Sequence, residues 1–452
     1  MLFDRQSLKK LIIPLIVEQF LSISMGLIDT LMVSSCGEAA VSGVSLVDSI
    51  SVLLIQILSA LATGGAVVCS QYIGKKMPKR ARLSAGQLMF IMIVTSGVVM
   101  LLVLFSYRQL LRLIFGQIDA DVMAAAETYF IISAISYPFL GLYNAGAALF
   151  RSVGNSRVSM YTSLVMNLIN ITGNAILIFG FGQGVFGAAV ATLIGRVVAA
   201  IVILSLLGRK KKYTDTEDED EVNPLRLTWS DLRPQRDVIA RILKIGVPSG
   251  VENGMFQVGK LLVSSLTATF GTAAIAANAV ASNVAGFANI PGNAMGLAMV
   301  TVIGRCIGAG EKEQAKRYSK KLLRLAYLGI WFANVMMVLF VHPIVSLFSL
   351  SAEATAIAKQ LLTTFAICAS CIWPLSFTLP NTLRAAGDAK YTMGVSVFSM
   401  WVFRVFSSYF FAGTMGLGVL GVWIGMYVDW LFRTILFVIR YLRGKWLNKR
   451  VV

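Results

Sequence analysis

The feature that most constrains this 452-residue chain is an internal repeat, in which the second half resembles the first at a fixed offset. Pro14 and Glu18 fall on Pro248 and Glu252 under that offset, which is 234 residues. The same shift places Gly37 on Gly271 and Gly74 on Gly308. In an apolar chain, a repeat of this length is typical of membrane transporters built from two similar helix bundles around a central site.

Composition places both halves in a membrane. The chain is 57% hydrophobic and only 14% charged, whereas soluble domains carry about 25% charged residues. Apolar stretches of about 18 residues or more recur throughout, which predicts an all-α polytopic membrane protein. The twelve predicted spans are 11–34, 44–71, 84–106, 121–149, 158–180, 185–207, 239–269, 277–304, 322–348, 352–383, 391–413 and 418–441.

The net charge of +18 follows from topology, so no nucleic-acid partner is expected. Most basic residues lie at the two termini and in the even-numbered loops, and the other side of the membrane holds only Arg108, Arg112 and Lys359. Basic loops stay in the cytoplasm. This pattern predicts a multi-pass protein of the cell inner (plasma) membrane with both termini cytoplasmic. Contact with anionic lipid headgroups is expected on that side.

One long hydrophilic stretch separates the halves. The sequence predicts a six-helix lobe over 1–207, a charged cytoplasmic linker over 208–237, and a second six-helix lobe over 238–452. Because six spans return the chain to its starting side, we expect parallel repeats related by a pseudo-two-fold axis along the membrane normal. The acidic run 215–221 is interpreted as a solvated linker, with a regulatory cation site as the alternative.

Residues for enzymatic, metal or nucleotide chemistry are sparse. Cys368 and Cys371 form a CxxC without a second pair, and the single histidine, His342, lies at the end of a span. We find no phosphate-binding glycine loop with its Lys-Ser/Thr. No cofactor is therefore expected, and the chain is not expected to be an enzyme.

The first lobe carries polar residues where a membrane span should be apolar. A carboxylate near the bilayer centre costs about 2.5–3.5 kcal/mol, which makes Asp29 a functional candidate. Asn170 and Asn174 lie one turn apart on the fifth span, and Thr192 lies on the sixth. A carboxylate, two amide oxygens and a hydroxyl suit a small hard cation, while a desolvated Asp29 could carry a proton instead.

This set was not duplicated with the rest of the chain. The 234-residue shift takes Asp29 to Val263 and Thr192 to Met426. A residue needed only for the fold should be useful in both lobes, whereas an ion site need occur once. Glu18, eleven residues before Asp29 on the same face and roughly 16 Å away, is a further proton or substrate candidate. Pro14, one turn earlier, is expected to let this helix bend.

In the second lobe, Glu252 and Gln257 are additional proton or substrate candidates, and Arg404 and Asp429 are expected to form a buried pair. Asp48 is interpreted as a helix cap near the end of a span. Methionine and aromatic residues could line an adaptable pocket for flat or cationic molecules, although core packing explains each one separately. These residues are Met255, Phe256, Trp373, Phe377, Met400, Trp401 and Trp423.

Four segments together resemble the multidrug and toxic compound extrusion (MATE) family of bacteria. The first-span segment holds Pro14, Gly26, Leu-Ile-Asp29-Thr-Leu-Met-Val and Gly37, and Arg151-Ser-Val-Gly-Asn155 resembles the inner-loop motif after the fourth span. Asn170-Ile-Thr-Gly-Asn174 and 184–192 resemble the fifth and sixth spans. The resemblance covers essentially the whole chain.

The resemblance implies two six-helix lobes and export of organic cations and amphipathic drugs, driven by entry of H⁺ or Na⁺. It also implies that the cation site falls on Asp29, Asn170, Asn174 and Thr192. Asn174 stands where relatives carry Asp, a change expected to weaken a sodium site or leave Asp29 as a lone proton carrier. Some relatives carry acidic residues in the seventh and tenth spans. Here Glu252 lies earlier than expected, and the tenth span has no acid beyond Glu353 at its start.

The sequence thus predicts a secondary active antiporter, active as a monomer, with small organic molecules as substrates. Its coupling ion is H⁺ or Na⁺. The alternative within transport is a flippase of lipid-linked precursors. Flippases of that kind carry a strongly cationic cavity, whereas the basic residues away from the ends of the spans here are Arg196, Lys260, Arg404 and Arg433.

Overall fold

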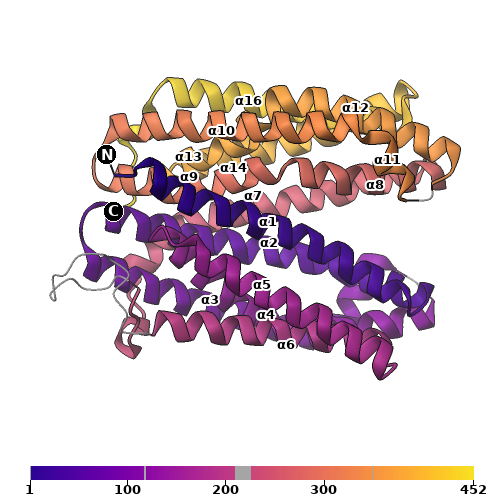
Figure 1. Ribbon diagram of the computed structural model, residues 1–452, viewed down its shortest axis with the longest axis horizontal. Coiled ribbons are helices and arrows are strands. Elements are labelled where there is room, and N and C mark those ends of the chain that lie inside the picture. The colour runs from indigo at the N-terminus through magenta and orange to yellow at the C-terminus, as the bar shows by residue number, and fades with distance from the viewer. Residues whose placement is uncertain (1, 117–118, 209–224, 349) are drawn as a thin grey trace. The chain divides into compact units, whose positions relative to one another are not determined.

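The computed structural model describes residues 2–116, 119–208, 225–348 and 350–452, and these are almost entirely helical, which confirms the all-α prediction (Figure 1). Contacts divide the chain into two compact units, Asp4–Gly250 and Val251–Val451, with Leu2 and Phe3 joining the second. We call them the first lobe and the second lobe. The acidic run 215–221 lies outside the described residues.

The first lobe contains six long helices that run side by side (Figure 1). Their bounds are α1 Arg5–Ser34, α2 Glu38–Gly74, α3 Pro78–Phe115, α4 Ala120–Ser152, α5 Ser156–Asn174 continued by the π-helix η1 Ala175–Gly180, and α6 Gly184–Leu207. Each is long and apolar enough to cross a membrane. The side chain of Asp4 caps α1 by accepting a hydrogen bond from the Ser7 amide, at 2.6 Å.

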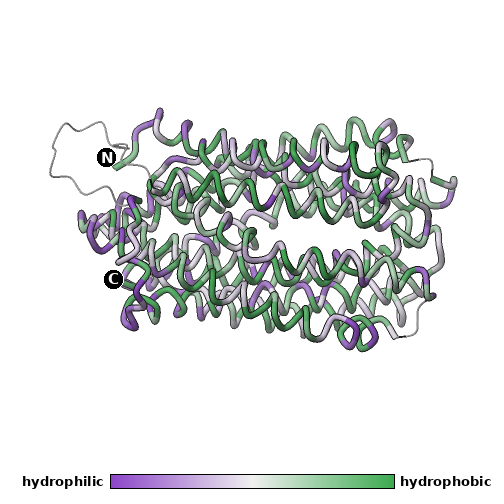
Figure 2. The backbone as a smooth tube through the Cα atoms, turned by 90° about the horizontal axis from the view of Figure 1, so that it is seen from below, coloured by the Kyte–Doolittle hydropathy of each residue, from purple (hydrophilic) through white to green (hydrophobic). Residues whose placement is uncertain are grey.

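The second lobe contains the equivalents of the predicted seventh to twelfth spans. Their bounds are α7 Arg236–Ala268, α8 Thr272–Ala288, α9 Ile290–Gly308, α10 Lys312–Leu339, α11 Val341–Ser346, α12 Ala352–Trp373 with η3 Pro374–Thr378 and α13 Pro380–Ala386, α14 Ala389–Phe398 with η4 Ser399–Val405, α15 Phe406–Ser408 and η5 Tyr409–Thr414, and α16 Gly418–Leu442. In both lobes, hydrophobic residues dominate the middle of the helices, and hydrophilic residues gather toward their ends (Figure 2).

Within the described chain, eleven helices meet the length and hydropathy expected of a membrane span. The predicted seventh span, 239–269, does not meet both criteria: it corresponds to α7, which has 33 residues but carries Glu252, Asn253, Gln257 and Lys260 along its second half. The predicted eighth span is broken at Asn289, where α8 ends and α9 begins. Pro291 follows at once, and because proline lacks an N–H it suits the first turn of the new helix.

The beginning of α7 packs within the first lobe, which is why the boundary between the lobes falls at Gly250, thirteen residues later than the end of the predicted linker at 237. A Cβ on Gly64 of α2 would lie 2.7 Å from the Gly246 backbone nitrogen and 2.9 Å from the Ile242 carbonyl oxygen of α7. Glycine at position 64 therefore permits a backbone-to-backbone approach that no larger residue allows.

We expect Gly64→Ala to destabilise the protein by about 1–3 kcal/mol, because rigid backbone would have to move to admit the methyl group. Gly97→Ala on α3 is the matched control, since a Cβ there meets nothing within 4 Å. Thermal unfolding of both variants in detergent measures the difference. Equal melting temperatures would show that the close contact between α2 and α7 is wrong.

The described end of the predicted linker is packed against α3. Thr228 and Asp231 form a reciprocal capping box on a short 3-10 helix, Trp229–Leu232. The Gln87 side-chain amide donates to the carbonyl oxygens of Asp231 and Arg233, each at 2.8 Å, and Arg82 pairs with Asp231 at 3.3 Å. Residues 225–235 are therefore held on the first lobe by directed polar contacts.

Two of the aromatic residues for which both a pocket and core packing were considered belong to the core of the second lobe. Trp373 and Trp423 are each 5% exposed and lie in one buried cluster. Trp373 stacks on Phe377 with ring centroids 5.1 Å apart, and Trp423 packs edge-on against Phe365 at 5.9 Å. The bulk of these side chains fills the lobe, so for both tryptophans the structure agrees with core packing rather than with the pocket.

Candidate functional site

Three helices of the first lobe bring the four predicted cation-site residues into one hydrogen-bonded chain. The Asn174 amide nitrogen donates to Asp29 Oδ1 at 2.7 Å and to Asn170 Oδ1 at 3.1 Å. The Asn170 amide nitrogen donates to Thr192 Oγ1 at 2.8 Å. Asp29 comes from α1, the two asparagines from α5 and Thr192 from α6, so the chain ties these helices together.

The orientation of the Asn174 amide follows from its neighbours. Its nitrogen lies between two oxygen acceptors, which only an N–H₂ group can satisfy. Its oxygen, Oδ1, is buried and has no hydrogen-bond partner among the described residues. A buried oxygen left without a donor is costly, and it is a ready ligand for a cation beside the Asp29 carboxylate.

Polar contacts along the seam between α1 and α5 explain this alignment. Pro14 cannot donate to the carbonyl of Lys10, and the Ser156 hydroxyl donates to the Leu11 and Lys10 carbonyl oxygens, at 2.6 and 3.3 Å. Further along, Asn167 donates to the Leu21 carbonyl at 3.3 Å. α5 thus supplies a donor at the proline turn and another at the middle of α1.

The helical pattern changes directly after the site. α5 ends at Asn174, and residues 175–180 continue it as a π-helix. Short π-helical segments are frequent at functional sites. The backbone after Asn174 is therefore wound more widely than the regular α-helix that carries Asn167 and Asn170.

Two charged residues near the site complete its electrostatics. Asp48 of α2 and Arg196 of α6 both interact electrostatically with Asp29, and the Tyr129 hydroxyl hydrogen-bonds to Asp48. Arg196 also donates to the Ser136 hydroxyl at 2.6 Å. The region therefore combines two carboxylates with one guanidinium.

The interpretation of Asp48 as a helix cap is wrong. α2 begins at Glu38, so Asp48 lies ten residues inside the helix, where no free backbone amide remains to be capped. The apolar window that predicted a span from 44 placed its start too late. Asp48 is a half-buried carboxylate in the interior of a 37-residue helix. The sequence signal that could have revealed it is the helix start at Glu38, which would have placed Asp48 inside the span.

Glu18 lies apart from this chain, in a buried ion pair. Arg151 Nη1 lies 2.8 Å from Glu18 Oε1, and the Ser159 hydroxyl donates to Glu18 Oε2 at 2.7 Å. Both Glu18 oxygens are thus engaged by α4 and α5. The sequence predicted neither partner, because Arg151 was read as a loop residue.

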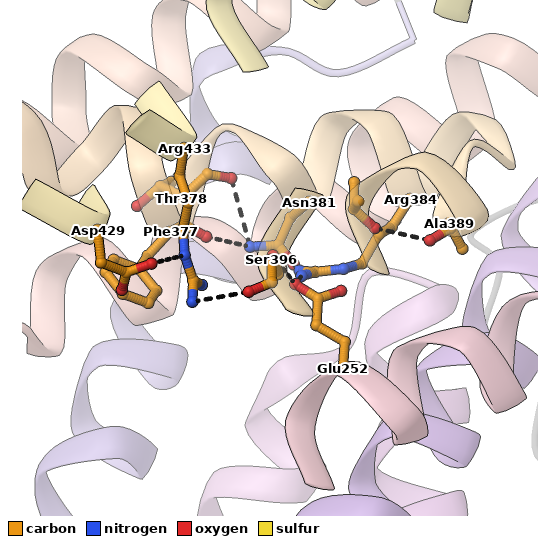
Figure 3. Close-up of polar contacts among 10 residues, drawn as sticks. Glu252, Phe377, Thr378, Asn381, Arg384, Ala389, Ser396, Asp429 and Arg433 are labelled. Atoms are coloured by element: carbon orange, nitrogen blue, oxygen red, sulfur yellow. Dashed lines mark hydrogen bonds and ion pairs between the residues drawn. The ribbon is translucent and has the colours of Figure 1, made fainter. Parts of the chain in front are cut away.

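The second lobe repeats this arrangement. Arg384 Nη2 lies 2.6 Å from Glu252 Oε1, and the Ser396 hydroxyl donates to the same oxygen at 2.5 Å (Figure 3). Three residues recur in similar places in both lobes. A glutamate follows a proline by one turn in the first span of each lobe, an arginine follows the fourth span, and a serine lies on the fifth. Gln257, the remaining candidate on α7, is half-buried beside Phe256.

Asp429 pairs with a different arginine from the one expected. Arg433 Nε lies 2.8 Å from Asp429 Oδ1, one turn along α16 (Figure 3). The Ser399 hydroxyl donates to the same oxygen at 2.5 Å. Asp429 and Arg433 are fully buried side chains, 0% and 3% exposed. The predicted ion pair between Arg404 and Asp429 is therefore wrong. Arg433 lies one turn from Asp429 on the same helix, and its side chain binds the carboxylate instead.

The comparison with known families decides the assignment. The MatE family model matches residues 14–176 and again residues 248–410. The chain belongs to the MATE family. The two matches begin at Pro14 and Pro248 and repeat the 234-residue offset seen in the sequence, so each lobe of this MATE protein is one copy of the family's repeat.

Individual relatives support the same family assignment. The chain is 30% identical to the uncharacterized transporter YisQ of Bacillus subtilis, over 98% of this chain and 95% of the relative. It is 26% identical to the probable multidrug resistance protein NorM of Thermotoga maritima, over 99% and 94%. A solved outward-facing MATE transporter matches with a TM-score of 0.89 at 22% identity, over 98% and 96%, which supports the fold.

As a member of this family the protein is a multi-pass membrane transporter and not an enzyme. Among the described residues no group of three or more His, Cys, Asp or Glu could hold a metal ion. Asp29 and Asp48 are the two carboxylates of this polar group in the first lobe, and Asn174 stands where the family resemblance implies an Asp.

Proposed function

We propose that this MATE protein is a secondary active antiporter that exports organic cations and amphipathic drugs in exchange for H⁺ or Na⁺. Its family is one of multidrug efflux transporters, and the NorM relative carries the name of a probable multidrug resistance protein. The observation that supports ion coupling best is the chain Asp29–Asn174–Asn170–Thr192 together with the unpartnered Asn174 oxygen.

The site suits ion exchange for a physical reason. The Asp29 carboxylate shares its surroundings with Asp48 and with only one guanidinium, that of Arg196. A proton or sodium ion would remove this excess negative charge and would compete for the oxygen that holds the Asn174 amide. Because Asp29 contacts α5 through Asn174, ion binding would alter the packing of the Pro14-containing helix against α5.

Coupling needs the ion and the substrate to favour different states of one transporter. In our proposal, the ion binds at Asp29, shifts α1 relative to α5, and lowers the affinity for the exported molecule. Glu18, Glu252 and Gln257 are proposed as further contacts for protons or substrate. For Glu18 and Glu252 this requires release of Arg151 and Arg384, respectively.

Liposomes test the proposal directly. The reconstituted protein is given a fluorescent organic cation, with a proton gradient or a sodium gradient imposed separately. Efflux driven by either gradient supports an antiporter and identifies the ion. Absence of drive by both would contradict the proposal and would favour the flippase alternative, which is tested with a fluorescent lipid precursor in the same vesicles.

Asn174 should set the choice of ion. We expect Asn174→Asp to strengthen drive by sodium, because it adds a second carboxylate within hydrogen-bonding reach of Asp29 and hard cations favour oxygen ligands of negative charge. The sodium concentration for half-maximal transport should fall about tenfold. Asn167→Asp, on the same helix but bonded to the Leu21 carbonyl, is the control. Equal sodium dependence in the two variants would contradict the proposed ligand role.

We also propose that the protein acts as a monomer in the inner membrane with both termini in the cytoplasm. The supporting observation is the concentration of basic residues on one side of the predicted spans. Labelling of single cysteines at Ser35 and Lys75, which follow α1 and α2, should give opposite accessibility from outside the cell.

A further inference from the structure

Arg404 is a buried cation that lacks an ion pair. It lies in η4, within the span that runs from Ala389 to Thr414, and its residue is 8% exposed. Its Nε atom has no hydrogen-bond partner, and no carboxylate lies within ion-pairing distance among the described residues. Its guanidinium carbon lies 5.3 Å from the centroid of the Phe256 ring, and the Arg433 guanidinium carbon lies at the same distance from that ring.

The surrounding charges increase this imbalance. The Asp429 carboxylate interacts electrostatically with Arg404 but lies beyond ion-pairing distance; its Oδ1 atom is bound by Arg433 and Ser399, and its buried Oδ2 atom has no hydrogen-bond partner among the described residues. Lys260, one turn after Phe256 on α7, is a second cation near Arg404, and its side chain is exposed. Glu252 is occupied by Arg384 and Ser396. The Lys260, Arg404, Arg433 and Asp429 group therefore carries excess positive charge.

An unpaired guanidinium inside a membrane protein is expensive, and such residues mark ligand or ion pathways. Arginine is well suited to carboxylates and phosphates because its planar fork can donate two parallel hydrogen bonds. Phe256 supplies an apolar wall against the guanidinium, and Lys260 supplies a second donor on the exposed side of the group.

We propose that Arg404, Lys260 and Phe256 form an anion subsite in the second lobe. It would take the carboxylate or phosphate of an amphipathic molecule, with that molecule's aromatic or apolar part against Phe256. As a subsite for exported molecules, it rests on the proposed transport function. The first-lobe site, with two carboxylates and one guanidinium, has the opposite sign, so the two lobes would accept different charges.

A matched pair of ligands tests the subsite. The protein is placed in nanodiscs of zwitterionic lipid and titrated with a fluorescent aromatic carboxylic acid and with its methyl ester, which has the same body without the charge. We expect the acid to bind wild type at least tenfold more tightly than the ester. Arg404→Gln should weaken the acid by about tenfold or more, as loss of a hydrogen bond to a charged group does, and should leave the ester unchanged.

Three further variants keep the test decisive. Arg404→Lys retains the charge and should retain most of the acid's affinity. Arg443→Gln removes an exposed cation just after α16 and should have no effect. If Arg404→Gln does not fold, Lys260→Gln, which alters an exposed side chain, should show the same selective weakening. Equal affinity of wild type for acid and ester, or equal weakening of both by Arg404→Gln, would overturn the subsite.

Lipid headgroups offer the same chemistry as a free amphipathic anion. A second set of nanodiscs, containing anionic phospholipid, separates these sources. If the anionic lipid competes with the acid in wild type but not in Arg404→Gln, lipid phosphate occupies the subsite. Gradient-driven efflux of an organic cation is followed separately. If the acid binds selectively but no gradient drives efflux, the subsite stands and the antiporter is rejected. If a gradient drives efflux but the acid binds no better than the ester, the subsite alone is rejected.

Discussion

Asp29→Asn is expected to reduce gradient-driven efflux to the level of protein-free liposomes. The substitution keeps the size of the side chain and one acceptor oxygen but removes the charge that would attract a proton or sodium ion. The Asn174 amide can still donate to the new side-chain oxygen, so α1 and α5 should remain aligned. We expect normal insertion into the membrane and a melting temperature close to that of wild type.

Two controls separate coupling from general loss of charge. Asp121→Asn changes an exposed carboxylate in the first turn of α4 and should leave efflux intact. Asp48→Asn tests the neighbouring carboxylate and should weaken drive without removing it, because Asp48 acts on the site through electrostatics rather than through Asn174. Normal resistance to toxic cations in cells carrying Asp29→Asn would contradict the account.

Asp429→Asn is expected to destabilise the second lobe by about 3–5 kcal/mol. It leaves the Arg433 guanidinium, 3% exposed, without its carboxylate in the interior of the lobe, and an uncompensated buried charge costs about that much. Thermal unfolding in detergent measures the loss. Glu313→Gln is the matched control, because Glu313 pairs with Lys316 on an exposed helix surface, where such pairs contribute about 0–1 kcal/mol.

A double replacement distinguishes the cost of leaving Arg433 unpaired from the loss of a stabilising interaction between Asp429 and Arg433. Asp429→Leu combined with Arg433→Met removes both charges while keeping comparable volume, and such exchanges are often neutral or stabilising. We therefore expect the double variant to unfold at a higher temperature than Asp429→Asn. A double variant as unstable as the single one would show that the pair stabilises the lobe by more than mutual neutralisation.

The sequence predicted the large features of the fold because membranes impose simple rules. Hydropathy and length located the spans but not the exact ends of the helices, since every backbone group in a bilayer must be bonded within a helix. The repeat located the two lobes, and the family model matches at that offset. Polar residues in apolar spans identified Asp29, Asn170, Asn174 and Thr192, which the structure brings together.

Contacts between distant segments could not be predicted in the same way. Arg151 and Arg384 follow the ends of their predicted spans, so nothing in a hydropathy pattern shows that they turn back to Glu18 and Glu252. The sequence offered Arg404 as the partner of Asp429, whereas Arg433, one turn along the same helix, forms the ion pair. The repeat did contain one unused signal, because both glutamates and both arginines recur in it.

Ion movement driven by substrate tests antiport most directly. Liposomes containing the protein are loaded with an organic cation and diluted without any ion gradient, while internal pH and sodium-22 uptake are followed. Because coupling between two ligands is reciprocal, outward substrate movement should draw H⁺ or Na⁺ inward, and Asp29→Asn should abolish that uptake. Substrate efflux from wild-type liposomes with no accompanying ion movement would contradict the antiporter account.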